Sequence, residues 1–319
     1  MQRKHKNPWD LWTGPISRTL ERVYNSKSPA TLFITRARQL FRESRPVGPP
    51  FDPREYADAL GIRVTEEDLG VDGILQCGAN RKFRIILNSK SNERRKNFTL
   101  AHEIAHTFFY FDLHEFGEKY RGSDNYDKEE ERLCNLAAAE LLMPFSCFNC
   151  DLLNFSDKRD VTPETVFSLM TKYRTSLQAV CMRIVWMKKS AACALWKRRG
   201  AALFSEWITP FRFKRLALCR TGHSSVEKAL VRPRQIITEP DTYYLDGRRT
   251  TRRTSSLLLR SGAVFSILQT RPSLTKQRIL GFDPGTSDFA GRPRFFRHAC
   301  ASLSTEEASR QFDLPFDEN

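Results

Sequence analysis

The chain has 319 residues, of which 40% are apolar and 11% aromatic, so it can bury one large core or several smaller ones and is neither disordered nor fibrous. No apolar run approaches the roughly 18 residues of a transmembrane helix, and the basic N-terminus is not followed by the apolar stretch of a signal peptide. Eight cysteines spread from Cys77 to Cys300 suit reduced thiols, so we expect a cytoplasmic protein with no membrane partner.

The formal net charge of +15 is distributed unevenly along the chain. Residues 1–50 carry a net charge of +7, residues 51–180 of −5, residues 181–300 of +17 and residues 301–319 of −4. This asymmetry indicates separate modules, and the basic ones are candidates for contact with a polyanion such as nucleic acid. A solvated basic surface with no particular partner is an equally good explanation.

The first hundred residues predict short helices and strands. Helical apolar spacing covers residues 32–44, and a shorter helix at 52–61 stops at a glycine before a strand at 62–64. Two further strands, at 73–77 and 83–88, enclose a turn that contains a glycine, which predicts a β-hairpin.

The strongest helix signal covers residues 91–111, where apolar residues recur at three- and four-residue spacing. A polar loop at 112–127 separates this helix from a second one at 128–143, which ends before a proline. Further along the chain we expect two short helices and two strands, at 163–172, 176–187, 191–196 and 263–270.

Residues 102–106 read HEIAH, an H-E-x-x-H motif on the strongest predicted helix. Residues four apart lie one above the other on a helix, so His102 and His106 point at one spot and can hold a Zn²⁺ ion. Glu103 projects about a quarter turn away, where its carboxylate can take a proton from an activated water. The motif predicts a catalytic metal site with Glu103 as the general base; two ordinary histidines and a solvated glutamate are the alternative.

A catalytic zinc site needs a third protein ligand, and the second helix offers one. Glu131 and Asn135 are four residues apart, so Glu131 can bind the metal while the Asn135 oxygen accepts a hydrogen bond from the far nitrogen of His102. Glu129 and Glu130 are alternatives, although no polar residue stands four positions after either of them. A His₂Glu site binds Zn²⁺, and it also takes Mn²⁺ or another divalent metal.

Two stretches of the chain, RRKNFTLAHEIAH at 94–106 and ERLCNLAAAELLMP at 131–144, together resemble the ImmA/IrrE family of bacterial metallopeptidases. The residues PPFDP at 49–53 and DGI at 72–74 are similar to the segment that precedes these motifs in the family. The resemblance covers roughly residues 30–190.

The resemblance implies an α+β fold, namely a zincin-like domain in which a small β-sheet lies beside two zinc-bearing helices. By position, it implies that His102, His106 and Glu131 are metal ligands, Glu103 is the general base, and Asn135 does not bind the metal but supports a ligand by a hydrogen bond. It also implies that the protein substrate is a helix-turn-helix transcriptional repressor, whose limited cleavage triggers a stress response or mobile-element transfer.

Some members of the family carry a helix-turn-helix-like segment after the peptidase domain, and residues 151–190 are similar to it. The second helix of this segment has a single basic residue, Arg183, whereas a DNA-recognition helix needs several polar side chains. We therefore expect this helix to pack against the peptidase domain.

The predicted organisation has four parts. A basic N-terminal extension covers residues 1–28, a zincin-like metallopeptidase domain 29–150, the helix-turn-helix-like segment 151–190, and a basic α/β region of uncertain fold 191–319. The predicted function is zinc-dependent endoproteolysis. The alternative is a non-proteolytic regulator with a structural or vestigial zinc site, which binds nucleic acid or a protein partner through its basic C-terminal region.

Overall fold

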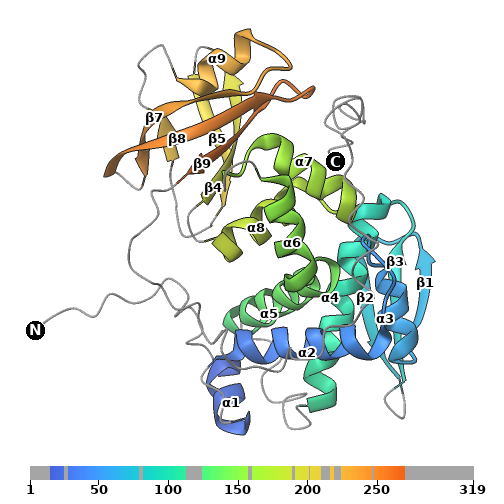
Figure 1. The fold of residues 1–319 in the computed structure, drawn as a ribbon. Helices are drawn as coiled ribbons and strands as arrows, with labels where there is room; N and C mark the ends of the chain where they lie inside the picture. Colours follow the sequence, from blue (N-terminus) through green and yellow to red (C-terminus); the bar gives the residue numbers. More distant parts are fainter. Residues whose placement is uncertain are drawn as a thin grey trace, which may run out of the picture. The chain divides into compact units, whose positions relative to one another are not determined.

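A computed structural model describes ten segments of the chain: residues 15–24, 28–78, 82–112, 124–156, 160–188, 191–200, 202–209, 216–218, 224–245 and 248–269 (Figure 1). They fall into two compact units. Unit 1 contains the described residues up to 156 together with Leu169–Met187, and unit 2 contains Asp160–Ser168 and the described residues from 188 onward.

Unit 1 contains a three-stranded sheet with the order β1-β3-β2. Strands β2 (Gly73–Cys77) and β3 (Phe83–Asn88) pair antiparallel, which confirms the predicted hairpin, and the tip of its turn at 79–81 lies outside the described residues. Strand β1 (Arg63–Glu67) pairs parallel with β3. Strand β2 is therefore an edge strand, and one side of its backbone is not used by the sheet.

Two long helices pack together beside this sheet. Helix α4 (Glu93–Asp112) contacts β2 and β3, and helix α5 (Asp124–Leu142) packs along α4. Their contact faces follow helical spacing, with these side chains buried: Leu100, Ala101, Ile104, Ala105 and Phe108 on α4, and Leu133, Cys134, Ala137, Ala138 and Leu141 on α5.

Four more helices complete the first part of unit 1. Helix α2 (Pro29–Ser44) packs on α5, and helix α3 (Pro53–Ala59) packs between α2 and α4. Helix α1 (Pro15–Tyr24) lies within the predicted N-terminal extension, yet it contacts α5 and buries Ile16 and Leu20. Helix α6 (Phe145–Phe155) follows Pro144 and was not predicted, because its sequence FSCFNCDLLNF has no helical N-cap side chain and few strong helix formers.

The helix boundaries differ from the prediction mainly at the start of α5. Residues 124–127 were expected in a loop, whereas they form its first turn. Residues 113–123 of the predicted loop lie outside the described part of the chain.

No single helix in the described residues is long and apolar enough to cross a membrane, although α5 and α6, bent by 65° at their junction, pass that test as a pair.

The two predicted helices of the helix-turn-helix-like segment are present as α7 (Pro163–Tyr173) and α8 (Leu177–Lys188). Helix α8 is packed into unit 1, as predicted. Its single arginine, Arg183, is only 3% exposed and pairs with Glu140 of α5, which also binds Arg38 of α2 at 2.7 Å. Arg183 is therefore buried in an ion pair and is not available to contact DNA.

Unit 2 contains a six-stranded sheet with the order β5-β4-β9-β8-β7-β6 that nearly closes into a barrel (Figure 1). All its neighbouring strands are antiparallel. The strands are β4 (Ala191–Arg199), β5 (Ala202–Thr209), β6 (Leu216–Leu218), β7 (Ile237–Leu245), β8 (Arg248–Leu258) and β9 (Val264–Gln269), and one short helix, α9 (Ser225–Val231), packs on β7, β8 and β9.

The predicted strands at 191–196 and 263–270 are confirmed as parts of β4 and β9, but the expected α/β region is wrong. An α/β fold needs parallel strands joined by helices, whereas the described strands form antiparallel neighbours. Strand β8, with the sequence RRTTRRTSSLL, was not predicted because it lacks the alternating apolar residues that indicate a strand. Its buried positions include Thr254, Ser255 and Ser256 instead.

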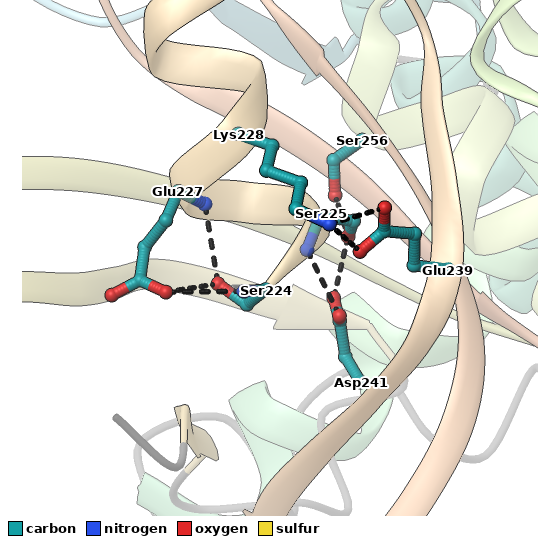
Figure 2. A network of polar contacts seen from close by, with 7 residues as sticks. All are labelled: Ser224, Ser225, Glu227, Lys228, Glu239, Asp241 and Ser256. Atoms are coloured by element: carbon teal, nitrogen blue, oxygen red, sulfur yellow. Dashed lines mark hydrogen bonds and ion pairs between the residues drawn. The ribbon is translucent and has the colours of Figure 1, made fainter. Parts of the chain in front are cut away.

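A buried polar network fastens α9 to the sheet (Figure 2). The Asp241 carboxylate on β7 accepts hydrogen bonds from the backbone N–H and the hydroxyl of Ser225, the first residue of α9. The Ser225 hydroxyl also contacts the Ser256 hydroxyl of β8 at 2.8 Å. A carboxylate at a helix N-terminus is stabilised by the free N–H groups there, which explains how a charge of this kind is accommodated in the core.

Candidate metal centre

Helix α4 brings the two histidines of the HEIAH motif together. The ring centroids of His102 and His106 are 4.8 Å apart, and their Nε2 atoms face each other at 3.1 Å. This arrangement follows from the four-residue spacing, which places both side chains on one face of the helix. The opposite face of the same turns is held in the core by Leu100 and Ile104.

Glu131 of α5 completes a set of three metal-binding groups. One of its carboxylate oxygens lies 3.2 Å from His102 Nε2, and the other lies 3.4 Å from His106 Nε2. One donor atom from each of the three residues lies within 4.8 Å of the others, and among the described residues this is the group that can hold a metal ion. The Glu131 side chain is 53% exposed, so solvent reaches the centre from the side of α5.

The spacing of the two histidine nitrogens fits a tetrahedral ion, and the Glu131 carboxylate lies close to both of them. When zinc has ligand distances of about 2.0–2.1 Å, neighbouring ligand atoms lie about 3.3 Å apart. The two Nε2 atoms lie 3.1 Å apart, which is close to this value, and each lies 3.2 or 3.4 Å from a different oxygen of the Glu131 carboxylate. Two imidazole nitrogens and a carboxylate are also the donor types that zinc takes in hydrolytic enzymes, so the residues present fit the ion.

Each histidine has a partner for its far nitrogen. Asn135 Oδ1 lies 3.0 Å from His102 Nδ1, and Glu130 Oε1 lies 2.8 Å from His106 Nδ1. Such partners fix the orientation of a metal-binding imidazole and raise its basicity. Glu129, which directly precedes Glu130, is buried and accepts a hydrogen bond from the Ser17 backbone N–H of α1.

The electrostatics of the centre favour a cation. Hydrogen bonds to His102 and His106 hold the pKa of Glu131 well below its usual range, so Glu131 is a carboxylate at neutral pH. Burial lowers the pKa of His106, but hydrogen bonds to Cys134, Glu130 and Glu131 outweigh burial and raise that pKa far above its usual range. The His106 ring therefore lies in a negative field that stabilises positive charge.

Glu103 lies beside the three donors without belonging to them. Burial raises the pKa of its carboxyl group, while the charges of His106 and His102 oppose that rise and the charge of Glu131 adds to it. A raised pKa brings a carboxylate closer to neutral pH, where a general base works best. The backbone N–H of Leu75 on β2 donates a hydrogen bond to this carboxylate.

Comparison with known protein families agrees with this arrangement. A model of the M78 peptidase family, described as the IrrE N-terminal-like domain, matches residues 57–185. The chain contains an IrrE N-terminal-like domain. This domain spans the end of α3, β1 to β3, α4 to α7 and most of α8, and it includes the three candidate metal ligands and Glu103.

Two relatives carry the name radiation response metalloprotease IrrE. The one from Deinococcus deserti is 32% identical over 114 residues, which are 35% of this chain and 40% of that protein. The one from Deinococcus radiodurans is 41% identical over 63 residues, or 19% of each chain. The chain thus spans less than half the length of either relative. A solved Mycobacterium tuberculosis transcriptional regulator has a TM-score of 0.46 and 15% identity, over 74% of this chain and 76% of that one.

The structure brings together the five residues that the sequence singled out: His102, His106, Glu131, Glu103 and Asn135. Their roles as ligands, base and support remain predictions. Sequence reasoning weighed Glu130 only as an alternative ligand and missed its contact with His106. Glu130 directly precedes the proposed ligand Glu131. Helical spacing does not indicate which of the two nitrogens of the His106 ring a carboxylate at this position will contact.

Proposed function

We propose that this protein is a zinc-dependent endopeptidase that makes a limited cut in a helix-turn-helix transcriptional repressor, in the cytoplasm, as part of a stress or mobile-element response. The observation that carries the proposal is the set of three metal-binding side chains, His102, His106 and Glu131, gathered beside the carboxylate of Glu103. The name of the two Deinococcus relatives supports the link to a stress response.

In this proposal His102, His106 and Glu131 hold the zinc ion, while Asn135 and Glu130 orient the two imidazoles. Zinc in such a site polarises a peptide carbonyl and acidifies a water molecule. Glu103 takes the proton of the attacking water, and it returns that proton to the amine that leaves when the peptide bond breaks.

The proposal is tested with purified wild type and Glu103→Gln, which should bind the same amount of metal. Elemental analysis should find about one zinc per chain in both. A proteome-derived peptide library, read by mass spectrometry, should give cleavage products with wild type and a loss of at least about 100-fold in rate with the variant.

His102→Ala is the matched control, because it should lose the metal as well as the activity. Cleavage by Glu103→Gln at the wild-type rate would contradict the assigned base. Absence of bound zinc in wild type, even after zinc is added, would contradict the proposed function as a whole.

A further inference from the structure

Strand β2 presents an unpaired backbone edge to the candidate base. Asn88 donates its N–H to the Asp72 carbonyl at 2.9 Å, and Gly78 donates to the Lys82 carbonyl at 2.9 Å. In an antiparallel pair, alternate residues use their backbone groups in the ladder. The backbone groups of Asp72, Gly78 and every second residue between them face β3, so those of Gly73 and Leu75 face away from the sheet.

The outward N–H of Leu75 is the group that donates to the Glu103 carboxylate. Glu103 is therefore held from the side of the sheet by a backbone donor, and its position depends on how closely β2 approaches α4. The start of β2 is tied to α4 by Arg95, whose guanidinium contacts both carboxylate oxygens of Asp72 at 2.6 and 2.7 Å.

Gly73 makes this close approach possible because it lacks a side chain. A Cβ atom at position 73 would lie 2.5 Å from Thr99 Cγ2 and 3.5 Å from the Cγ and Oε1 atoms of Glu103. Only the first contact is impossible. Thr99 is buried on α4 and is β-branched, so its side chain cannot rotate away easily. A side chain at position 73 would therefore push β2 away from the helix.

We propose that Gly73 and Leu75 are positioning residues for Glu103: Leu75 orients the carboxylate through its N–H, and Gly73 lets the strand come close enough for this bond. The inference rests on the proposed function, because Glu103 is taken as the base of that reaction. A misplacement of a reacting group by about 1 Å can cost on the order of 100-fold in rate.

The kinetic test compares Gly73→Ala, Thr99→Ser and the double variant on the library peptide that wild type cleaves best. We expect Gly73→Ala to lower kcat by at least about 10-fold with KM within about 2-fold, while zinc content stays unchanged. Thr99→Ser removes the Cγ2 atom that a new Cβ would strike, so the double variant should recover to within about 3-fold of Thr99→Ser alone. A change in KM with constant kcat, or no recovery in the double variant, would overturn the proposal.

A second measurement follows the hydrogen bond itself and does not depend on activity. In protein labelled with ¹⁵N-leucine, the Leu75 amide signal should move in Glu103→Gln and in Gly73→Ala, and return toward its wild-type position in the double variant. The signal is assigned by its loss in Leu75→Ile. A Leu75 amide that is unchanged in Glu103→Gln would overturn the proposal, even if Gly73→Ala failed to fold.

The two measurements keep this inference distinct from the proposed function. If wild type cleaves no peptide, the proposed function fails, and the amide signals alone decide whether β2 positions Glu103. If wild type cleaves but the amide does not respond, the proposed function stands and the positioning role fails.

Discussion

At the scale of single residues, three consecutive glutamates on α5 have three different environments. Glu129 is buried and accepts a hydrogen bond from the α1 backbone, Glu130 contacts the far nitrogen of His106, and Glu131 faces both histidine Nε2 atoms. Successive helical residues are about 100° apart, so neighbours in the sequence point to different parts of the molecule. Only Glu131 is in a position to bind the same ion as the two histidines.

Glu130 should therefore support the metal without binding it. We expect Glu130→Gln to weaken zinc affinity by about 10- to 100-fold, because its contact with His106 Nδ1 loses its charge. Competition with a chromophoric chelator measures the affinity. Arg132→Gln, at an exposed position of the same helix, is the control and should bind zinc as wild type does. Equal affinities for Glu130→Gln and wild type would show that this contact does not support the ligand.

At the scale of secondary-structure elements, polar contacts decide how the parts of unit 2 are joined. Helix α9 is short, and its N-terminus has two caps: Ser224 forms a capping box with Glu227, and the Asp241 carboxylate binds Ser225 (Figure 2). Lys228 adds an ion pair with Glu239 of β7. A carboxylate in this position joins helix and sheet more specifically than apolar packing alone.

The stability of unit 2 should depend on pH through Asp241. Burial raises the pKa of its carboxyl group above the ordinary 3.8, although hydrogen bonds from Ser225 and Tyr243 oppose the rise. Between 3.8 and the raised value the folded state binds more protons than the unfolded state, so the Asp241 contribution to stability falls as pH rises through that window.

Urea unfolding from pH 4 to pH 7, read by amide exchange of β7 and β8 in a pulse at one fixed pH, measures this effect. The unfolding free energy of wild type minus that of Asp241→Asn should decrease as the pH rises, and it should level off above the raised pKa of Asp241. Glu206→Gln, at an exposed site on β5, should show no such difference from wild type. A difference that grows with rising pH would mean that the pKa of Asp241 is lowered instead.

At the scale of the whole molecule, the candidate metal centre belongs to unit 1 alone, since its donors come from α4 and α5. Some exposed arginines of the described part of unit 2 lie far from one another. Strand pairing places Arg198 and Arg199 at the tip of the β4–β5 hairpin and Arg249 near the tip of the β7–β8 hairpin, at opposite ends of the sheet and roughly 40 Å apart along it. These three arginines therefore do not form one basic patch.

Metal removal should affect the two units differently. Zinc at about 100 times its Kd stabilises the state that binds it by about 2.7 kcal/mol, so a chelator should speed amide exchange in α4 and α5. Exchange in β4 and β9 should stay the same. Hydrogen-exchange mass spectrometry measures both regions in one experiment, and His102→Ala should exchange like chelated wild type. An equal effect on both units would contradict a metal centre confined to unit 1.

Local pattern was sufficient for the elements of the candidate centre. The apolar stripe of α4, the i, i+4 spacing of its histidines, and the β2–β3 hairpin depend on residues close together in the chain, so their periodicity predicts them. The spacing of Glu131 and Asn135 on α5 is likewise a local feature, and these contacts could be expected before the structure was known.

The tertiary structure alone decided how distant segments meet. The contact of Glu130 with His106 and the closeness of Gly73 to Thr99 depend on the packing of α5 and β2 against α4, which no periodicity encodes. The antiparallel sheet of unit 2 was not predicted because part of its core is polar. Strand β8 buries serine side chains whose hydroxyl groups are paired with groups on other strands, as Ser256 is with Ser266 at 2.7 Å. A buried polar residue resembles an exposed one in the sequence, and only its partner in space distinguishes the two.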